Sequence, residues 1–535
     1  MTDQPPVDQR DPQQPSSTES VTNISGGVDL DAQRDVNIGG DVVGRDKITE
    51  IVEGDKVAGD KIVEQQITAT GRSIAIGKLN VPLVPLIAAL GLGLAALLLI
   101  VFISSSTQQQ VQQILPTPTP VKMTGDFNVL VAEFGEESAD GTLQSTDRGR
   151  QLSKTVFETL QAQKDDLPDA TIRTAIELRH TAAPLGKPIT DETAAQQAAV
   201  QVGAQMVIYG TIDPRGDFTP NFYVAPEVRG NIMGLNTGTF QFGDEPIQFG
   251  SGAQFNANAD LRTRSSALMY IITGLTYDLF GRVEQSLEIY QQAQEQLKAW
   301  PEKGQGKEIL YFFLGQAAFF KQFNVAAEDA PALNDQAQAA FERALNSNPA
   351  YTRAMIGLGG VFNTRIQRLD ATAKALGSSD LSEMFAWYDK ALAQARQDGD
   401  AFMEQMANFS LAGAYYLQGV AFRFSGETAN AVASFAAAVQ HLDPAEQYFA
   451  DTARQRELAQ VYLLQGNIYK QHAETVSAGG DQVEAQTLYG QAQQAYQRCL
   501  DQAERAPDDR LVTDTIVRDF CRPLLQQVTS ALNSP

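Results

Sequence analysis

Histidine and cysteine are the side chains from which metal and nucleophilic sites are most often built, and this chain has few of either. The three histidines, His180, His441 and His472, are far apart and share no metal-ligand spacing with acids or cysteines. A lone histidine on a helix is more often a surface or satisfied core residue than a ligand. The two cysteines, Cys499 and Cys521, fit no zinc framework. We interpret them as buried thiols, with a Cys499–Cys521 disulfide as the alternative if their region is extracytoplasmic.

One stretch imitates a phosphate-binding loop. "GRSIAIGKL", residues 71–79, has five residues between its glycines, and Leu79 stands where serine or threonine would bind magnesium. The GxSxG, HExxH and CxxC patterns are absent from the sequence. We therefore predict no catalytic residue, no metal site and no cofactor, and a protein that is not an enzyme. Carboxylate chemistry leaves no short signature, so an enzyme acting through the α/β domain expected at residues 125–255 stays a lower-ranked alternative.

Length and charge narrow the class of protein further. A chain of 535 residues is too long for one ordinary core, so several domains are expected. The net charge of -23 argues against a nucleic-acid partner, whose phosphates favour a basic surface. An acidic surface of this kind mainly confers solubility.

An uncharged apolar stretch of 23 residues, "VPLVPLIAALGLGLAALLLIVFI", covers residues 81–103. About 20 apolar residues in a helix cross a bilayer, so we predict one transmembrane helix at residues 79–104 and disfavour the alternative of a buried core helix. Lys61, Arg72 and Lys78 precede the stretch, and the next basic residue is Lys122. The positive-inside rule then places the N-terminus in the cytoplasm and the rest of a single-pass cell-membrane protein outside.

The segments beside the predicted membrane helix have distinct compositions. Residues 1–23 are expected to be a disordered leader, and residues 105–124 a linker rich in glutamine and proline. Residues 24–72 contain "GDVVGRDKI" and "GDKVAGDKI", whose apolar bursts between Gly-Asp turns predict a short β-repeat segment. Residues 24–67 resemble a segment at the front of some bacterial signalling and defence proteins, which implies an assembly or recruitment role. Two such short units bury little apolar surface, so we expect the segment to self-associate. A disordered, charged leader is the alternative.

Residues 125–255 are predicted to form an α/β domain with a partly parallel sheet. "FNVLVAEF", "ATIRTAIEL" and "QMVIYGTI" are expected strands, followed by the shorter "NFYVAP" and "TGTFQF". "DRGRQLSKTVFETLQAQ" has helical spacing, and a second helix is expected after Thr190 as its N-cap, ending at Gly203. "VLVAEF" and "AAVQVGAQMVIYGTID" are similar to the N-terminal domain of TolB, which implies protein contact or small-ligand sensing.

Residues 260–530 repeat one pattern of small and aromatic residues. The two uninterrupted copies carry this pattern at Gly274, Tyr277, Ser286, Tyr290 and Ala293, and at Gly419, Phe422, Ala431, Phe435 and Ala438. Three further copies contain insertions. Small residues let paired helices approach, and the aromatic residues fill the gaps. The pattern resembles the tetratricopeptide repeat, which implies an α-helical solenoid with a concave face that binds proteins or peptides.

The fold class expected for the whole chain is therefore a multidomain protein. A tetratricopeptide solenoid is preceded by a small α/β domain, one transmembrane helix and a short N-terminal β-repeat segment. The resemblance places partner contacts on the first helix of each pair. These contacts are Phe312, Gln316, Phe319, Phe320, Asn363, Tyr416, Arg423, Phe424, Asn467 and Lys470. Core packing is the alternative role for the aromatic residues of this set.

From these features we expect a bacterial, membrane-anchored scaffold or sensor. Its extracytoplasmic repeats would bind a protein or peptide, its residues 79–104 would contact the bilayer, and its residues 24–67 would self-associate in the cytoplasm. The alternative is an extracytoplasmic assembly factor whose N-terminal leader is inert.

Overall fold

The computed structural model describes residues 121–181, 187–226, 228, 235–249, 255, 258–369, 372–507, 509 and 511–533. The predicted leader, β-repeat segment and transmembrane helix, and the predicted linker up to residue 120, lie outside these ranges. Within them, no helix combines the length and the apolarity that crossing a bilayer requires.

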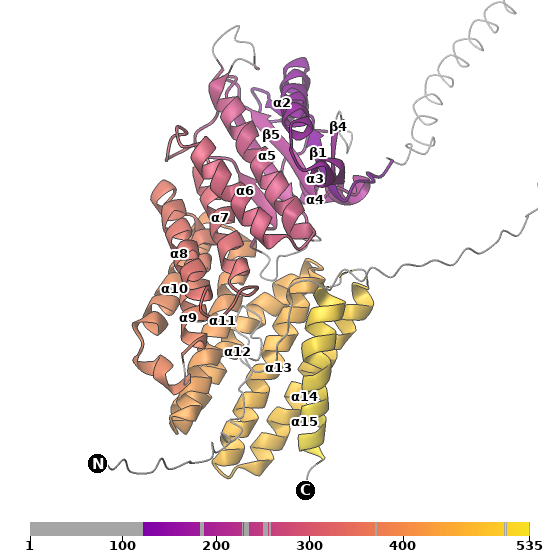
Figure 1. Ribbon diagram of the computed structural model, residues 1–535. Helices are drawn as coiled ribbons and strands as arrows, with labels where there is room; N and C mark the ends of the chain where they lie inside the picture. The colour runs from indigo at the N-terminus through magenta and orange to yellow at the C-terminus, as the bar shows by residue number, and fades with distance from the viewer. Residues whose placement is uncertain are drawn as a thin grey trace, which may run out of the picture. The chain divides into compact units, whose positions relative to one another are not determined.

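A mixed sheet forms the first part of the described chain (Figure 1). Its strands are β1 (Phe127–Ala132), β2 (Gly135–Glu137), β3 (Leu143–Ser145), β4 (Ile176–Thr181), β5 (Met206–Ile212), β6 (Phe218–Val224) and β7 (Gly238–Gln241). Strand β1 pairs in parallel with β4 and β5, and β2 also pairs in parallel with β5. On the other edge of β5, β6 and β7 add antiparallel strands. The predicted partly parallel sheet is confirmed.

Helices cover both faces of this sheet because successive side chains of a strand point to opposite faces. Val129 and Val131 of β1 belong to the core shared with α2 (Asp147–Asp165) and α3 (Ala170–Ala175). Leu130 and Ala132 face the alanines of α4 (Glu192–Val202). The sequence pattern predicted α2 and α4 correctly.

Two local predictions were wrong. The expected strand "ATIRTAIEL" begins as α3, whose N-cap Asp169 accepts hydrogen bonds from the backbone N–H groups of Thr171 and Ile172, and only Ile176 starts β4. The cap of α4 is Asp191, which accepts from Ala194 N, and not the preceding Thr190. In both cases an aspartate satisfies a free N–H of the first turn.

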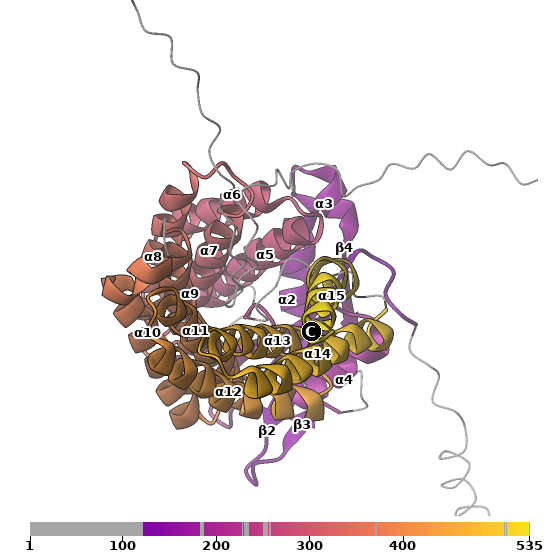
Figure 2. The ribbon, with the colours of Figure 1, turned by 90° about the horizontal axis from the view of Figure 1, so that it is seen from below.

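Stacked antiparallel helices follow in pairs, and Figure 2 shows the pairs following one another in chain order. The pairs are α5 (Ala259–Leu279) with α6 (Val283–Gln296), α7 (Lys307–Lys321) with α8 (Ala330–Ser347), α9 (Thr352–Gln367) with α10 (Ser379–Asp398), α11 (Ala401–Phe424) with α12 (Thr428–Asp451), and α13 (Gln455–Ala478) with α14 (Gln482–Arg505). A short 3₁₀ helix, η2 (Thr372–Gly377), lies between α9 and α10, within the insertion expected in the third copy.

Close contact between a glycine and an aromatic ring recurs within the pairs. A Cβ atom on Gly274 would lie 2.3 Å from the ring of Tyr290, and one on Gly419 would lie 2.6 Å from the ring of Phe435. Gly466 has the same relation to Tyr496, at 2.4 Å. The described residues therefore form a helical repeat region in which a ring of the second helix occupies the space left by a missing side chain.

Helix α5 joins the two parts of the described chain. It pairs with α6, and it also packs on α2 and α3, the helices that cover one face of the sheet. One continuous hydrophobic core includes Phe127 of β1, Ile271 of α5 and Phe341 of α8. The sheet and the helical region therefore stabilise one another.

A disulfide joins Cys499 and Cys521, whose Cα atoms are 6.3 Å apart. It links α14 to the end of a π-helix, η3 (Leu511–Cys521), which leads directly into α15 (Arg522–Leu532). The structure thus selects the alternative pairing over two buried free thiols. Both cysteines are fully buried, so the bridge is part of the core.

Candidate functional site

The ten residues predicted to contact a partner lie on the first helices α7, α9, α11 and α13. Six of them are buried: Phe312, Gln316, Phe319, Asn363, Tyr416 and Asn467. Phe312 packs edge-on against Tyr351, with ring centroids 5.8 Å apart. Asn467 accepts a hydrogen bond of 2.8 Å from the hydroxyl of Tyr496. The side chains of these six residues lie inside the protein.

The other four predicted contact residues, Phe320, Arg423, Phe424 and Lys470, have accessible side chains. Arg423 and Lys470 are brought together, because Glu474 lies 2.8 Å from the first and 3.6 Å from the second. Phe424 is 47% exposed beside Arg423. Phe320 is half-buried on α7, where its ring packs edge-on against Phe319.

The histidines form no common site. His180 Nε2 lies 2.9 Å from the hydroxyl of Ser153, which is fully buried and so cannot reach a substrate. His441 Nδ1 lies 3.1 Å from the Asn408 side chain, and the ring of His472 lies against Phe435. In the part of the chain that the structure describes, no group of histidine, cysteine or acidic residues could hold a metal ion.

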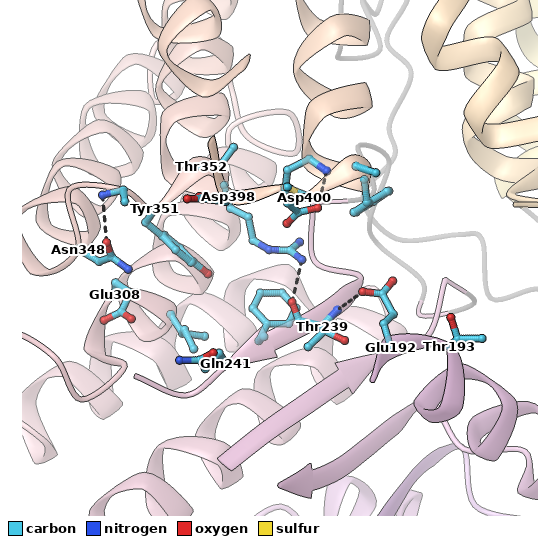
Figure 3. Close-up of a pocket in the computed structure, with 18 of the residues that line it drawn as sticks. Glu192, Thr193, Thr239, Gln241, Glu308, Asn348, Tyr351, Thr352, Asp398 and Asp400 are labelled. Carbon is cyan, nitrogen blue, oxygen red and sulfur yellow. Dashed lines mark hydrogen bonds between the residues drawn. The ribbon is translucent and has the colours of Figure 1, made fainter. Parts of the chain in front are cut away.

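A cleft of about 750 Å³ lies where the sheet meets the helical region (Figure 3). One side is formed by the first turns of α4 and by β7, and the other by the start of α7 and three connections between successive helix pairs. These connections are α8–α9, α10–α11 and α12–α13. In Figure 3, Glu192 and Thr193 lie on one side of the cleft, and Glu308, Asn348 and Tyr351 on the other. Thr239 of β7 lies between them and donates its N–H to Glu192, at 3.2 Å.

Buried arginines of the helical region bind backbone carbonyls around β7. Arg353 of α9 donates to the carbonyls of Leu235, Thr237 and Thr239, and its guanidinium stacks 4.1 Å above the ring of Phe240. Arg264 of α5 donates to the carbonyls of Phe242 and Glu245, and Arg456 of α13 to that of Val228. The cleft therefore has one wall fixed by charge-assisted hydrogen bonds.

Two arginines line the cleft, and both are engaged by the protein. Besides its carbonyl partners, Arg353 is so deeply buried that desolvation lowers its pKa. Arg454 lies 3.4 Å from both Glu192 and Glu457, and its guanidinium stacks 3.9 Å above Phe402. Arg353 and Arg454 therefore link the helical side of the cleft to its sheet side.

Glu308, in the first turn of α7, is the buried carboxylate of the cleft, with 3% of its surface exposed. Burial raises its pKa to about 7, and the nearby charge of Asp244 adds to the rise. A hydrogen bond from its own backbone N–H, the charge of Arg264 and a hydrogen bond from Asn348 lower the pKa without cancelling the rise. A carboxyl group with this pKa changes its protonation near neutral pH.

The chain matches no protein-family model and no curated protein. The geometry of the cleft and of the helix pairs is therefore the basis for proposing a function.

The residues of the cleft were not predicted from the sequence, because the cleft is assembled from connections that are far apart in the chain. The pattern that could have indicated it is a charged residue in the first turn of two first helices, Glu308 of α7 and Arg353 of α9. First turns are commonly charged and exposed, but these two side chains are at most 5% exposed. Burial of this kind is not visible in a single sequence.

Proposed function

We propose that this chain is a membrane-anchored binding protein that receives a partner outside the cytoplasm. The observation that carries the proposal is the cleft, because a concave site at the junction of two parts of a protein is a common place for ligands. A binding role also agrees with the helix pairs, which we propose to be of the tetratricopeptide type. The glycine–aromatic contacts at Gly274, Gly419 and Gly466 support that assignment.

The disulfide supports the proposed location of the binding region. Disulfides persist in oxidising compartments and are rare in the cytoplasm. The Cys499–Cys521 bridge therefore agrees with a topology in which everything after the predicted span at residues 79–104 lies outside. The role proposed for residues 24–67, self-association on the cytoplasmic side, rests on the sequence alone. If that segment does not self-associate, the protein is an extracytoplasmic assembly factor with an inert leader.

Topology can be tested in intact cells that carry a tag at residue 1. Protease added to spheroplasts should digest the C-terminal region while sparing the tag. Protection of residues 122–535 would make the protein a cytoplasmic scaffold instead.

The binding site can be tested by capture of partners on the full-length chain in detergent. Gln196→Trp places an indole at the mouth of the cleft from the exposed face of α4. Val200→Trp is the matched control, because Val200 is 67% exposed on the same helix and does not line the cleft. Partners held by the wild type and by Val200→Trp should be lost from Gln196→Trp. Retention by both variants, with loss from Phe424→Ala, would move the site to the accessible residues of α11 and α13.

A further inference from the structure

Two oxygen atoms of the cleft are buried without a hydrogen-bond partner among the described residues. They are Oε2 of Glu308 and the hydroxyl of Tyr351. A buried polar atom without a partner lowers the free energy of unfolding, typically by about 1–3 kcal/mol. Glu308 follows Gly306 and Lys307 at the start of α7, whereas Tyr351 precedes α9, so two successive helix pairs each supply one of the atoms.

The charges around these atoms favour a cation. The cleft is lined by the carboxylates of Glu192, Asp244, Glu308, Asp398 and Asp400. The two arginines that line it are bound to carbonyls or carboxylates of the protein, as described above, so neither guanidinium is free to hold an anion. Asp244, Asp398 and Asp400 are exposed, whereas Glu308 is buried. A positively charged ligand would thus pass exposed acids before it reaches a buried one.

We infer that the cleft binds an ammonium group, carried by a small amine or by a lysine side chain of a peptide, with Glu308 Oε2 and the Tyr351 hydroxyl as acceptors. An ammonium group has three donors and no acceptor, which suits a site with unpartnered acceptors. A guanidinium binds carboxylates best through two parallel hydrogen bonds. Glu308 offers only one free oxygen, because Asn348 and its own backbone N–H already interact with the carboxylate. This inference rests on the proposed function and names the chemistry of the ligand.

Ammonium binding should release protons. Near pH 7, before a ligand binds, Glu308 is protonated in about half of the molecules, since its pKa is about 7. An ammonium group placed against Oε2 favours the ionised form. Binding near pH 7 should therefore release about half a proton per molecule. Besides its own backbone N–H, the groups that act on this carboxyl are Asp244, Arg264 and Asn348.

The test is isothermal titration calorimetry on the full-length chain in detergent. The probes are cadaverine, a blocked alanyl-lysyl-alanine peptide, and the same peptide with norleucine in place of lysine. Two buffers of different ionisation enthalpy, neither of them a primary amine, report the proton release. We expect at least one of the two ammonium probes to bind with release of a proton fraction, and the norleucine peptide not to bind. Binding of the peptide alone identifies a peptide ligand, and binding of cadaverine alone identifies a small amine.

Variants assign the effect to the two acceptors. Glu308→Gln keeps the shape of the side chain and should weaken ammonium binding by about tenfold or more and abolish proton release. Tyr351→Phe should weaken binding less and keep the release. Asp278→Asn is the matched control, because the pKa of Asp278 is also raised to about 7 but the residue does not line the cleft. Its binding and proton release should equal those of the wild type.

The inference is overturned if neither ammonium probe binds, if the norleucine peptide binds as well as the lysine peptide, or if Glu308→Gln binds like the wild type while circular dichroism shows both folded. Failure of the probes together with loss of captured partners from Gln196→Trp would leave the proposed function standing and remove only the ammonium ligand.

Discussion

Arg454 and Glu192 form an ion pair of 3.4 Å across 262 residues of chain, and it joins the start of α13 to the first turn of α4. The same guanidinium lies 3.4 Å from Glu457 and above the ring of Phe402. One arginine thus holds the helical region to the sheet at the edge of the cleft.

The two carboxylates bound by Arg454 should differ in their effect on stability. Glu192 is 40% exposed, so Glu192→Gln should lower the free energy of unfolding by no more than about 1 kcal/mol. Arg454→Ala leaves Glu457, which is 3% exposed, buried without its cation, and should cost about 3–5 kcal/mol. Thermal unfolding of both variants measures the difference. Equal losses would show that the Glu457 contact contributes little.

The raised pKa of Glu308 makes stability depend on pH. Because its pKa is raised from 4.5 to about 7, the folded state binds more protons than the unfolded state between these values. Stability should therefore fall as pH rises through this window, by an amount on the order of 3 kcal/mol. Glu308→Gln removes this loss, so its melting temperature relative to the wild type should be higher at about pH 8 than at about pH 5. A pH-independent difference between the two proteins would contradict the raised pKa.

The glycine–aromatic contacts predict an unusual response to alanine. Replacing a helical glycine by alanine normally stabilises a protein by about 0.5–1 kcal/mol, and Gly490→Ala on α14 should do so because open space surrounds the position. Gly419→Ala should instead destabilise by about 1–3 kcal/mol, since its Cβ would lie 2.6 Å from the ring of Phe435. Gly419→Ala should cost less when it is made on top of Phe435→Leu, because the smaller side chain leaves room for the Cβ. Denaturant midpoints of the single and double variants measure these effects, and a stabilising Gly419→Ala would mean that the pair is packed more loosely.

Reduction of the Cys499–Cys521 bridge should lower the stability of the C-terminal helices. The bridge spans 22 residues, and closing a loop of this size stabilises a protein by about 3 kcal/mol. Dithiothreitol should therefore lower the melting temperature of the wild type. It should leave a variant carrying Cys499→Ser and Cys521→Ser unaffected. Reaction of both thiols with a maleimide in protein isolated without reductant would contradict the pairing.

The helix pairs could be predicted from the sequence because their packing repeats. Gly419 and Phe435 stand at a fixed interval on adjacent helices, so one local pattern reports one local contact. The strands at Phe127 and Met206 were equally predictable, since a buried strand is a short apolar run. The segment at Ala170 was not, because an aspartate cap outweighed the apolar pattern and started a helix.

The cleft could not be predicted, because its residues depend on how distant connections come together. Glu308 and Tyr351 are ordinary residues at the ends of helices until the fold brings them to one cleft with β7. The same holds for Arg353, whose carbonyl partners lie more than 100 residues earlier in the chain. Local propensity contains no information about such a contact.

Three consecutive connections, α8–α9, α10–α11 and α12–α13, line one cleft opposite β7. Each connection belongs to a different step of the helical stack, so their spacing depends on the angle between one pair and the next. Pairs in such a stack contact mainly their neighbours, and small changes of angle add along it. A ligand that spans the three connections would therefore stiffen the curvature of the stack. By reciprocity, a force that bends the distal helices would change the affinity of the cleft for its ligand. Mechanical load on the helices and ligand binding would then be coupled.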